Sequence, residues 1–187
     1  MTKKITLPTL VTLLRIILVP FIVWAIVAHQ WSVAFWLFLL AAVTDTVDGN
    51  LARFMGEQTF LGACLDPIAD KFLLLSCFLA LSLVHSPFIF IPTWFFILVL
   101  IKELLLVVGA IMLFLTRGEF EVKPTLLGKI TTAVQMAFIV WFFSCSMFHW
   151  LPVKTFYGIL VLIVVLTLSS LFQYAMAGLR FFFRFLR

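Results

Sequence analysis

The sequence predicts an all-α polytopic membrane protein, with six transmembrane helices and both termini in the cytoplasm. Three observations support this fold class. Of the 187 residues, 65% are hydrophobic and only 11% are charged, a composition that excludes a soluble domain. Several apolar runs reach the roughly 20 residues that a helix needs to cross a bilayer. The basic residues gather in alternate connections between these runs.

Polar breaks between the apolar runs define the predicted spans, which are residues 9–28, 31–53, 61–84, 88–116, 126–147 and 153–179. A cytoplasmic N-terminus leaves only Lys154 among the basic residues in an outer turn, as the positive-inside rule requires. Because no linker or repeat interrupts the spans, we expect one domain over residues 1–187. The small size and the lack of a transit peptide favour a bacterial inner membrane.

The first span follows the short segment "MTKKITLP", which we interpret as the start of an uncleaved signal anchor. Pro8 favours the beginning of a helix. Arg15 lies inside this span, in "LPTLVTLLR". An ionisable side chain within the bilayer is costly, so Arg15 is a candidate for a functional role.

The second and third spans contain four aspartates where they approach each other. Asp45 and Asp48 lie near the cytoplasmic end of the second span, and Asp66 and Asp70 lie near the start of the third. Separations of three and four residues place each pair on one helical face. A short connection makes the two helices antiparallel neighbours. We therefore expect the four carboxylates to converge at one depth.

Four converging anions repel one another and need cations among them. Ligands that are all oxygen favour Mg²⁺ or Mn²⁺, and two such ions can clamp a phosphoryl displacement. A helix N-terminus could stabilise Asp66 and Asp70 without any metal. The same explanation fails for Asp45 and Asp48, because the helix dipole opposes them.

The surroundings of the aspartates suit a phosphate-bearing ligand. Gly49, Gly62 and Ala52 leave room for its close approach, and Arg53 offers a fork of donors for phosphate oxygens. The full pattern, D-x2-D-G-x2-A-R-x8-G-x3-D-x3-D, resembles the motif of the CDP-alcohol phosphatidyltransferases at every fixed position and gap.

This resemblance implies a six-helix, usually dimeric membrane enzyme whose site opens to the cytoplasm. Such enzymes transfer a phosphatidyl group from CDP-diacylglycerol to an alcohol and release CMP. By resemblance, two divalent cations would be held by Asp45, Asp48, Asp66 and Asp70. Asp70 would also be the base that takes the proton of the attacking hydroxyl. The CDP pocket would be formed by Gly49, Ala52, Arg53 and Gly62, and Thr12 and Arg15 of the first span would face the nucleotide.

Lys102 and Glu103 lie in the middle of the fourth span and allow two interpretations. They could form a buried structural ion pair. Alternatively, Lys102 could line the acceptor pocket with Glu103 as its neighbour. The phosphatidylglycerophosphate synthases of the family are expected to have Arg-Glu here, and lysine keeps the charge but loses bidentate phosphate binding.

The fifth span begins with "GKITTAVQM", in which Lys129, Thr132 and Gln135 share one helical face. This stretch resembles "GK-x-x-T-x-x-Q" of the phosphatidylglycerophosphate synthases, whereas the preceding "KPT" resembles the cardiolipin synthases. Lys129 is the best candidate for binding an acceptor phosphate. Arg117 is either a second acceptor residue or an ordinary positive-inside residue.

The sixth span leads into the basic tail "LRFFFRFLR", which we expect on the anionic inner leaflet rather than on a nucleic acid. The histidines fall at predicted outer turns, where exposed turn residues are expected: His29, His85 and His149. The cysteines lie in apolar surroundings that predict packing rather than disulfides: Cys64, Cys77 and Cys145.

Together these observations predict phosphatidyl transfer from CDP-diacylglycerol to sn-glycerol 3-phosphate by a homodimer among membrane lipids. Transfer to phosphatidylglycerol, which gives cardiolipin, is the alternative within the same family. A cation or proton transporter is the alternative of another class. It is less favoured, because its acidic residues would be spread along a pathway through several spans.

Overall fold

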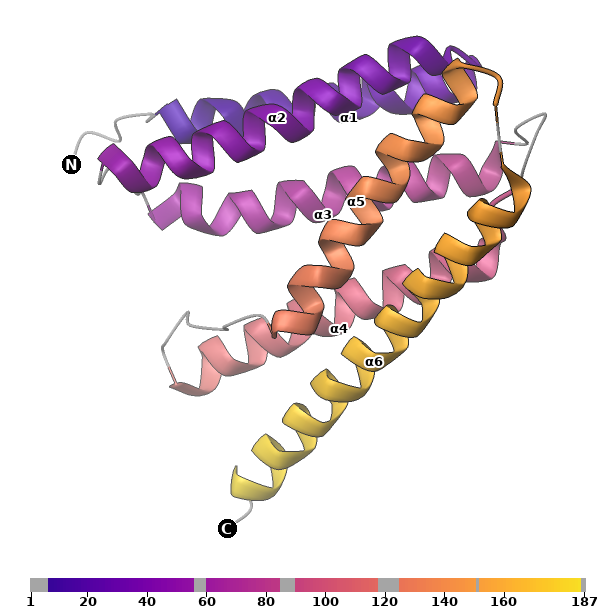
Figure 1. The fold of residues 1–187 in the computed structure, drawn as a ribbon. Coiled ribbons are helices and arrows are strands. Elements are labelled where there is room, and N and C mark those ends of the chain that lie inside the picture. The colour runs from indigo at the N-terminus through magenta and orange to yellow at the C-terminus, as the bar shows by residue number, and fades with distance from the viewer. Residues whose placement is uncertain (1–6, 56–59, 85–89, 118–124, 151, 186–187) are drawn as a thin grey trace. The chain divides into compact units, whose positions relative to one another are not determined.

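The computed structural model describes residues 7–55, 60–84, 90–117, 125–150 and 152–185, and side chains at 13–44, 69–84, 90–109, 125–150 and 152–176. Six α-helices contain most of these residues (Figure 1): α1 (Leu7–Val27), α2 (Trp31–Met55), α3 (Phe60–Leu83), α4 (Thr93–Arg117), α5 (Leu126–Met147) and α6 (Val153–Phe185). The predicted all-α class is therefore confirmed, with helices in the predicted order.

Two helix boundaries differ clearly from the prediction. Helix α4 begins at Thr93 instead of residue 88, where the Phe95 amide donates to the Pro92 carbonyl at 3.0 Å. Pro92 favours an extended conformation for the residue before it and so delays the helix. Helix α6 continues past residue 179 to Phe185, since no proline follows to end it.

Two of the described helical segments are long and apolar enough to cross a membrane by length and composition: Leu126–Met147 and Val153–Met176. Shorter apolar segments occur in α1 and α2, at Leu13–Val27 and Trp31–Thr44. The number of spans and the orientation of the termini stay predictions.

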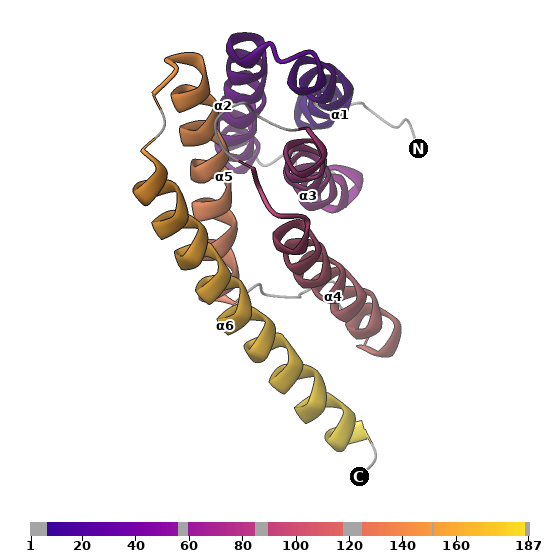
Figure 2. The same cartoon turned by 90° about the vertical axis from the view of Figure 1, so that its right-hand side faces the viewer.

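The chain divides into two compact units, and α5 contributes to both of them. The first unit contains residues 1–90 and 139–151, and the second contains residues 91–138 and 152–187. In the first unit, α1 packs against both α2 and α3 (Figure 2). The C-terminal half of α5 joins this unit through edge-to-face aromatic contacts, with ring centroids 5.8 Å apart for Phe38 and Phe143.

Helices α1 and α5 end in the same way, each at a histidine in the left-handed conformation. The φ angles are 56° at His29 and 54° at His149. The Gln30 amide donates to the Ala25 carbonyl at 2.8 Å, which closes the Schellman motif after α1. Both histidines are exposed turn residues, as expected from the sequence.

In the second unit, α4 packs against α6, and α5 contributes its N-terminal half. Phe95 and Val99 of α4 are buried, and the rings of Phe138 and Phe156 lie 5.7 Å apart. Large apolar side chains remain exposed on α4 and α6, including Trp94. Such outward-facing apolar residues are expected on helices that contact lipid.

Candidate active site

The aspartate motif lies on the helices that flank residues 56–59. Asp45 and Asp48 fall in the last three turns of α2, and Asp66 and Asp70 fall in the first three turns of α3. The side chains of the following motif and pocket candidates lie outside the described residues: Thr12, Asp45, Asp48, Gly49, Ala52, Arg53, Gly62 and Asp66. For these residues, the structure gives the helix position alone.

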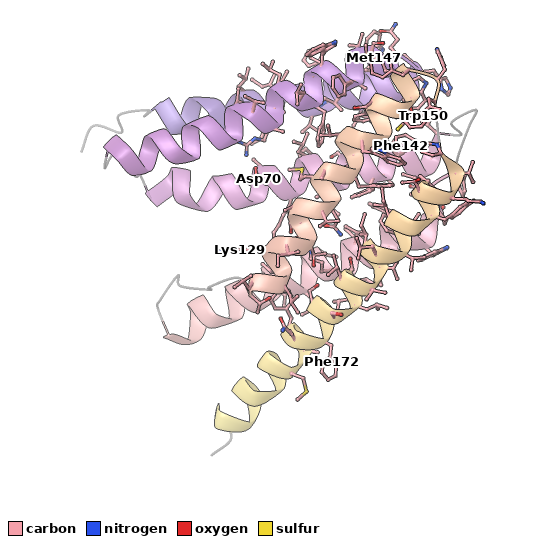
Figure 3. The ribbon with its side chains drawn as sticks, in the orientation of Figure 1. Asp70, Lys129, Phe142, Met147, Trp150 and Phe172 are labelled. Atoms are coloured by element: carbon pink, nitrogen blue, oxygen red, sulfur yellow. The ribbon has the colours of Figure 1, made fainter. Side chains whose placement is uncertain are left out.

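Asp70, which is labelled in Figure 3, is the motif aspartate whose side chain is described. It pairs with Arg15 of α1. The Arg15 guanidinium Nη1 donates to the Asp70 Oδ1 atom. Arg15 is only 2% exposed, whereas the Asp70 side chain is 30% exposed. A charge-assisted bond of this kind is strong where water is excluded. Arg15 therefore holds the Asp70 carboxylate from a neighbouring helix while leaving part of it accessible.

The positions of the four aspartates fit a divalent-cation site. Both pairs lie at comparable distances from the connection between α2 and α3, within one unit. All of the donors are carboxylates, which magnesium and manganese prefer. Among the side chains that the structure describes, no three histidine, cysteine, aspartate or glutamate residues gather, since only one of the four aspartates is included.

Lys102 lies in the interior of the second unit, with an exposure of 0%. Its Nζ atom is 2.6 Å from the Oε1 atom of Glu103, which is also buried. The ammonium further donates to Thr132 Oγ1 at 3.3 Å and to Gln135 Oε1 at 3.4 Å. A buried lysine needs such partners, because an unpaired charge there would be costly. The structure thus brings Lys102, Thr132 and Gln135 together.

The polar network continues from α5 to α6. The Gln135 Nε2 atom donates to Thr167 Oγ1 at 3.4 Å, and both residues are fully buried. The network therefore joins α4, α5 and α6 through hydrogen bonds in a largely apolar interior. Such bonds between membrane helices contribute modestly to stability, but they fix the side chains that make them.

Lys129 lies on the first turn of α5 and is exposed (Figure 3). Thr125 caps this helix, because its Oγ1 atom accepts the Gly128 amide at 3.2 Å. The Thr125 carbonyl accepts a hydrogen bond from the Lys129 amide at 3.1 Å, which is the first backbone hydrogen bond of the helix. The other cation suggested for the acceptor, Arg117, ends α4, and its side chain lies outside the described residues.

The start of α5 also lies against α6. The Thr125 hydroxyl bonds to the Tyr174 hydroxyl at 3.3 Å. An ideal Cβ atom at Gly128 would lie 2.0 Å from Tyr174 Oη, so this position requires glycine unless Tyr174 moves. The missing side chain of Gly128 thus makes room for the end of the Tyr174 ring beside α5.

Sequence reasoning missed three contacts of these candidate residues. It did not predict that Arg15 pairs with Asp70, nor that Thr167 and Tyr174 contact α5. The sequence did contain a signal for the contacts between α6 and α5. The polar residues Thr167, Ser170 and Tyr174 recur at helical spacing in an apolar span. The partner of Arg15 could not be read from spacing, since the two residues are far apart in the chain.

Comparisons with known proteins agree with the motif. Residues 5–183 match the family model described as CDP-alcohol phosphatidyltransferase. The chain is 33% identical to a CDP-diacylglycerol–glycerol-3-phosphate 3-phosphatidyltransferase of Escherichia coli strain K12, over 94% of this chain and 96% of that protein. It is 29% identical to the protein of the same name in Wigglesworthia glossinidia brevipalpis, over 96% and 94%.

A second kind of relative is also similar to the chain. A probable CMP-forming cardiolipin synthase of Drosophila melanogaster is 28% identical over 91% of this chain. The match covers 57% of that longer protein.

Proposed function

The chain belongs to the CDP-alcohol phosphatidyltransferase family, and we propose that it transfers the phosphatidyl group of CDP-diacylglycerol to sn-glycerol 3-phosphate. The products would be phosphatidylglycerophosphate and CMP. As a member of this family, the chain is a membrane-associated transferase of phospholipid biosynthesis. The observation that carries the choice of acceptor is the near full-length match to relatives named for glycerol 3-phosphate.

Members of this family use divalent metal ions. We propose that Asp45, Asp48, Asp66 and Asp70 hold two of them, Mg²⁺ or Mn²⁺, where α2 and α3 approach their connection. When bound, these ions would neutralise the diphosphate and stabilise the leaving CMP. The all-carboxylate donor set and the similar separation of the four positions from the connection between α2 and α3 support this assignment.

Asp70 is the proposed general base. It would take the proton of the acceptor hydroxyl, whose oxygen then bonds to the phosphatidyl phosphorus. The bond between that phosphorus and the oxygen bridging to CMP would break, so that CMP leaves. The ion pair with Arg15 supports this role, because it holds the carboxylate in one place while 30% of the side chain stays accessible.

The nucleotide end of the donor would lie beside the same helices. We propose that Arg53 binds phosphate oxygens and that small residues make space for the cytidine group. The CDP-binding residues of this proposal are Thr12, Gly49, Ala52, Arg53 and Gly62.

The acceptor phosphate would be bound by cations of α4 and α5. Lys129 is exposed on the first turn of α5 and can reach a water-soluble phosphate. Lys102 is buried with Glu103 and contacts Thr132 and Gln135. The proposed acceptor-binding residues are therefore Lys102, Arg117, Lys129, Thr132 and Gln135.

Other parts of the proposal follow from the family and the charge pattern. The chain would cross a bacterial inner membrane several times and act as a homodimer. Its site would face the cytoplasm, where CDP-diacylglycerol and soluble glycerol 3-phosphate can meet. Membership of an enzyme family favours phosphatidyl transfer over the cation or proton transporter.

Cardiolipin synthesis is the second candidate function, because the chain also resembles the Drosophila protein. In that reaction phosphatidylglycerol would replace glycerol 3-phosphate as the acceptor. The chemistry at Asp70 would be unchanged. The acceptor site would then need a lateral opening for a second lipid instead of convergent cations.

Radiolabelled product formation distinguishes these candidates. Purified protein in detergent would receive CDP-diacylglycerol with Mg²⁺ or Mn²⁺ and either glycerol 3-phosphate or phosphatidylglycerol. We expect product from glycerol 3-phosphate alone, and none after addition of EDTA. Product from phosphatidylglycerol alone would show the second function. A lack of both products would refute the proposal.

A further inference from the structure

Helix α6 presents polar side chains toward the interior of the second unit. Thr167 and Ser170 are fully buried, and Tyr174 is partly buried. Their separations of three and four residues place them on one face of α6. Two of these side chains bond to α5, whereas the Ser170 hydroxyl donates to the Thr167 carbonyl at 2.9 Å within α6. The polar face of α6 therefore meets α5 at two separate points.

At the first point, Thr167 fixes the orientation of the Gln135 amide. The Lys102 ammonium can only donate, so the amide oxygen must face it, as the distance of 3.4 Å between Nζ and Oε1 shows. The amide nitrogen then faces Thr167 Oγ1, which accepts its hydrogen. Among the described side chains of α6, Thr167 is the one that holds the amide in the orientation that Lys102 requires.

At the second point, Tyr174 holds the beginning of α5. Its hydroxyl bonds to Thr125, the residue that caps the helix. Its ring end also occupies the space beside Gly128 where another residue would place its Cβ atom. Lys129 follows Gly128 in the chain. The position of Tyr174 therefore affects where the Lys129 backbone lies, and with it the exposed ammonium group.

From these two contacts we propose that Thr167 and Tyr174 are positioning residues, which set how α5 presents Gln135 and Lys129 to the acceptor. This inference rests on the proposed function, since it assigns α5 the acceptor site. The inference gives α6 a part in the acceptor site, because this helix would align the α5 residues that bind the acceptor. Neither side chain needs to touch the acceptor for this role.

Steady-state kinetics tests the proposal with conservative variants. We expect Thr167→Val and Tyr174→Phe each to raise the acceptor KM by about 5-fold to 10-fold, the size expected for one lost hydrogen bond. The kcat and the KM for CDP-diacylglycerol should stay unchanged, since neither contact involves a residue proposed to bind the donor or the metal ions. Thr167→Ser should behave like the unaltered chain, because serine keeps the hydroxyl acceptor.

Ser170→Ala is the matched control. Ser170 is buried on the same face of α6, but among the described residues its hydroxyl bonds within its own helix, to the Thr167 carbonyl. We expect its acceptor KM to be unchanged. If Thr167→Val and Tyr174→Phe match this control, or change the KM of both substrates equally, the proposal is wrong.

A double variant and an exchange measurement separate positioning from general stability. In a Gln135→Leu background, Thr167→Val should add no further rise in acceptor KM, because its effect passes through Gln135. Amide hydrogen exchange in the first turn of α5 should be faster in Tyr174→Phe than in Ser170→Ala. If the effect of Thr167→Val adds to that of Gln135→Leu, the positioning role of Thr167 is wrong. If amide exchange is unchanged in Tyr174→Phe, the positioning role of Tyr174 is wrong.

The outcome also shows which proposal fails. If the unaltered chain uses phosphatidylglycerol instead of glycerol 3-phosphate, the proposed function is wrong, and the same KM comparison with phosphatidylglycerol tests the positioning role. If neither acceptor gives product, the proposed function fails, and amide exchange alone decides whether Tyr174 holds α5. Normal transfer with no effect of the variants would reject the positioning role alone.

Discussion

The two units each contain an ion pair, and the pairs differ in how they are made and in how far they are buried. In the first unit, Arg15 and Asp70 come from separate helices and are 55 residues apart in the sequence. In the second unit, Lys102 and Glu103 are successive residues of α4. The first pair leaves Asp70 30% exposed, whereas the side chains of the second pair are at most 3% exposed.

This difference separates a pair that leaves a carboxylate partly accessible from one that neutralises a charge in the interior. The Arg15 contact aligns α1 with α3 and leaves part of a carboxylate accessible. The Lys102–Glu103 contact aligns no two helices by itself, so the alignment comes from the hydrogen bonds of Lys102 to α5. Accessibility therefore favours Asp70 for chemistry and leaves the role of Lys102 to be tested.

The largest expected effect comes from Asp70→Asn. Asparagine keeps the size of the side chain but cannot take a proton, so we expect the rate of CMP release to fall by about 10³-fold. This corresponds to about 4 kcal/mol of transition-state stabilisation. The rate is measured with saturating CDP-diacylglycerol and acceptor.

Loss of the ion pair could by itself destabilise the first unit, so the control is the double variant Arg15→Gln with Asp70→Asn. It removes both charges and should unfold at a temperature close to that of the unaltered chain, yet stay inactive. A rate above a tenth of normal in either variant would contradict the assignment of Asp70 as the base.

The second largest effect is on the free energy of unfolding and concerns the buried ion pair of Lys102 and Glu103. Lys102→Met leaves the Glu103 charge buried without its lysine partner, so the free energy of unfolding in detergent should fall by about 3 kcal/mol. The variant Lys102→Met with Glu103→Gln should recover most of this loss. Thermal unfolding followed by tryptophan fluorescence measures both changes.

The same double variant sharpens the interpretation of Lys102. If this residue binds the acceptor, the acceptor KM should remain raised although stability has recovered. A normal KM in the stable double variant would make Lys102–Glu103 a structural pair only. Equal stability of the single and double variants would contradict the electrostatic explanation.

A smaller effect is expected from Arg15→Lys. Lysine keeps the positive charge but loses the planar fork of donors, so the Asp70 carboxylate should be held less precisely. We expect kcat to fall by about 10-fold, with a loss of about 1 kcal/mol in the free energy of unfolding. An unchanged kcat would mean that charge alone, rather than the geometry of the guanidinium, is needed beside Asp70.

The smallest effect provides a baseline for the comparison. His29→Gly should raise the free energy of unfolding by about 1 kcal/mol, because glycine adopts a positive φ at no steric cost. His149→Gly has the same geometry and is the matched variant. Neither should alter kcat, as measured beside thermal unfolding. A changed kcat would show that the rate of phosphatidyl transfer depends on the stability of the fold. The effects of the Arg15 and Lys102 variants on kinetics would then have to be corrected for their loss of stability.

The sequence by itself determined the helices and the family. Helix formation depends on local properties, so the apolar runs predicted all six helices, and the boundaries of α5 at Leu126 and Met147 matched the predicted span. The motif predicted the family because its fixed residues and gaps lie within one short segment. The beginning of α4 and the end of α6 differed most from the predicted spans, and the ends of α1, α2 and α3 differed by one or two residues.

Only the tertiary structure decided which polar groups meet. Which charge pairs with Arg15 depends on how α1 and α3 are rotated against each other, and spacing along one helix does not contain that information. The contacts of Gln135 with Thr167 and of Gly128 with Tyr174 arise in the same way, from helices that are distant in the sequence. Packing in three dimensions fixes these pairs, because each must be satisfied in an interior that excludes water.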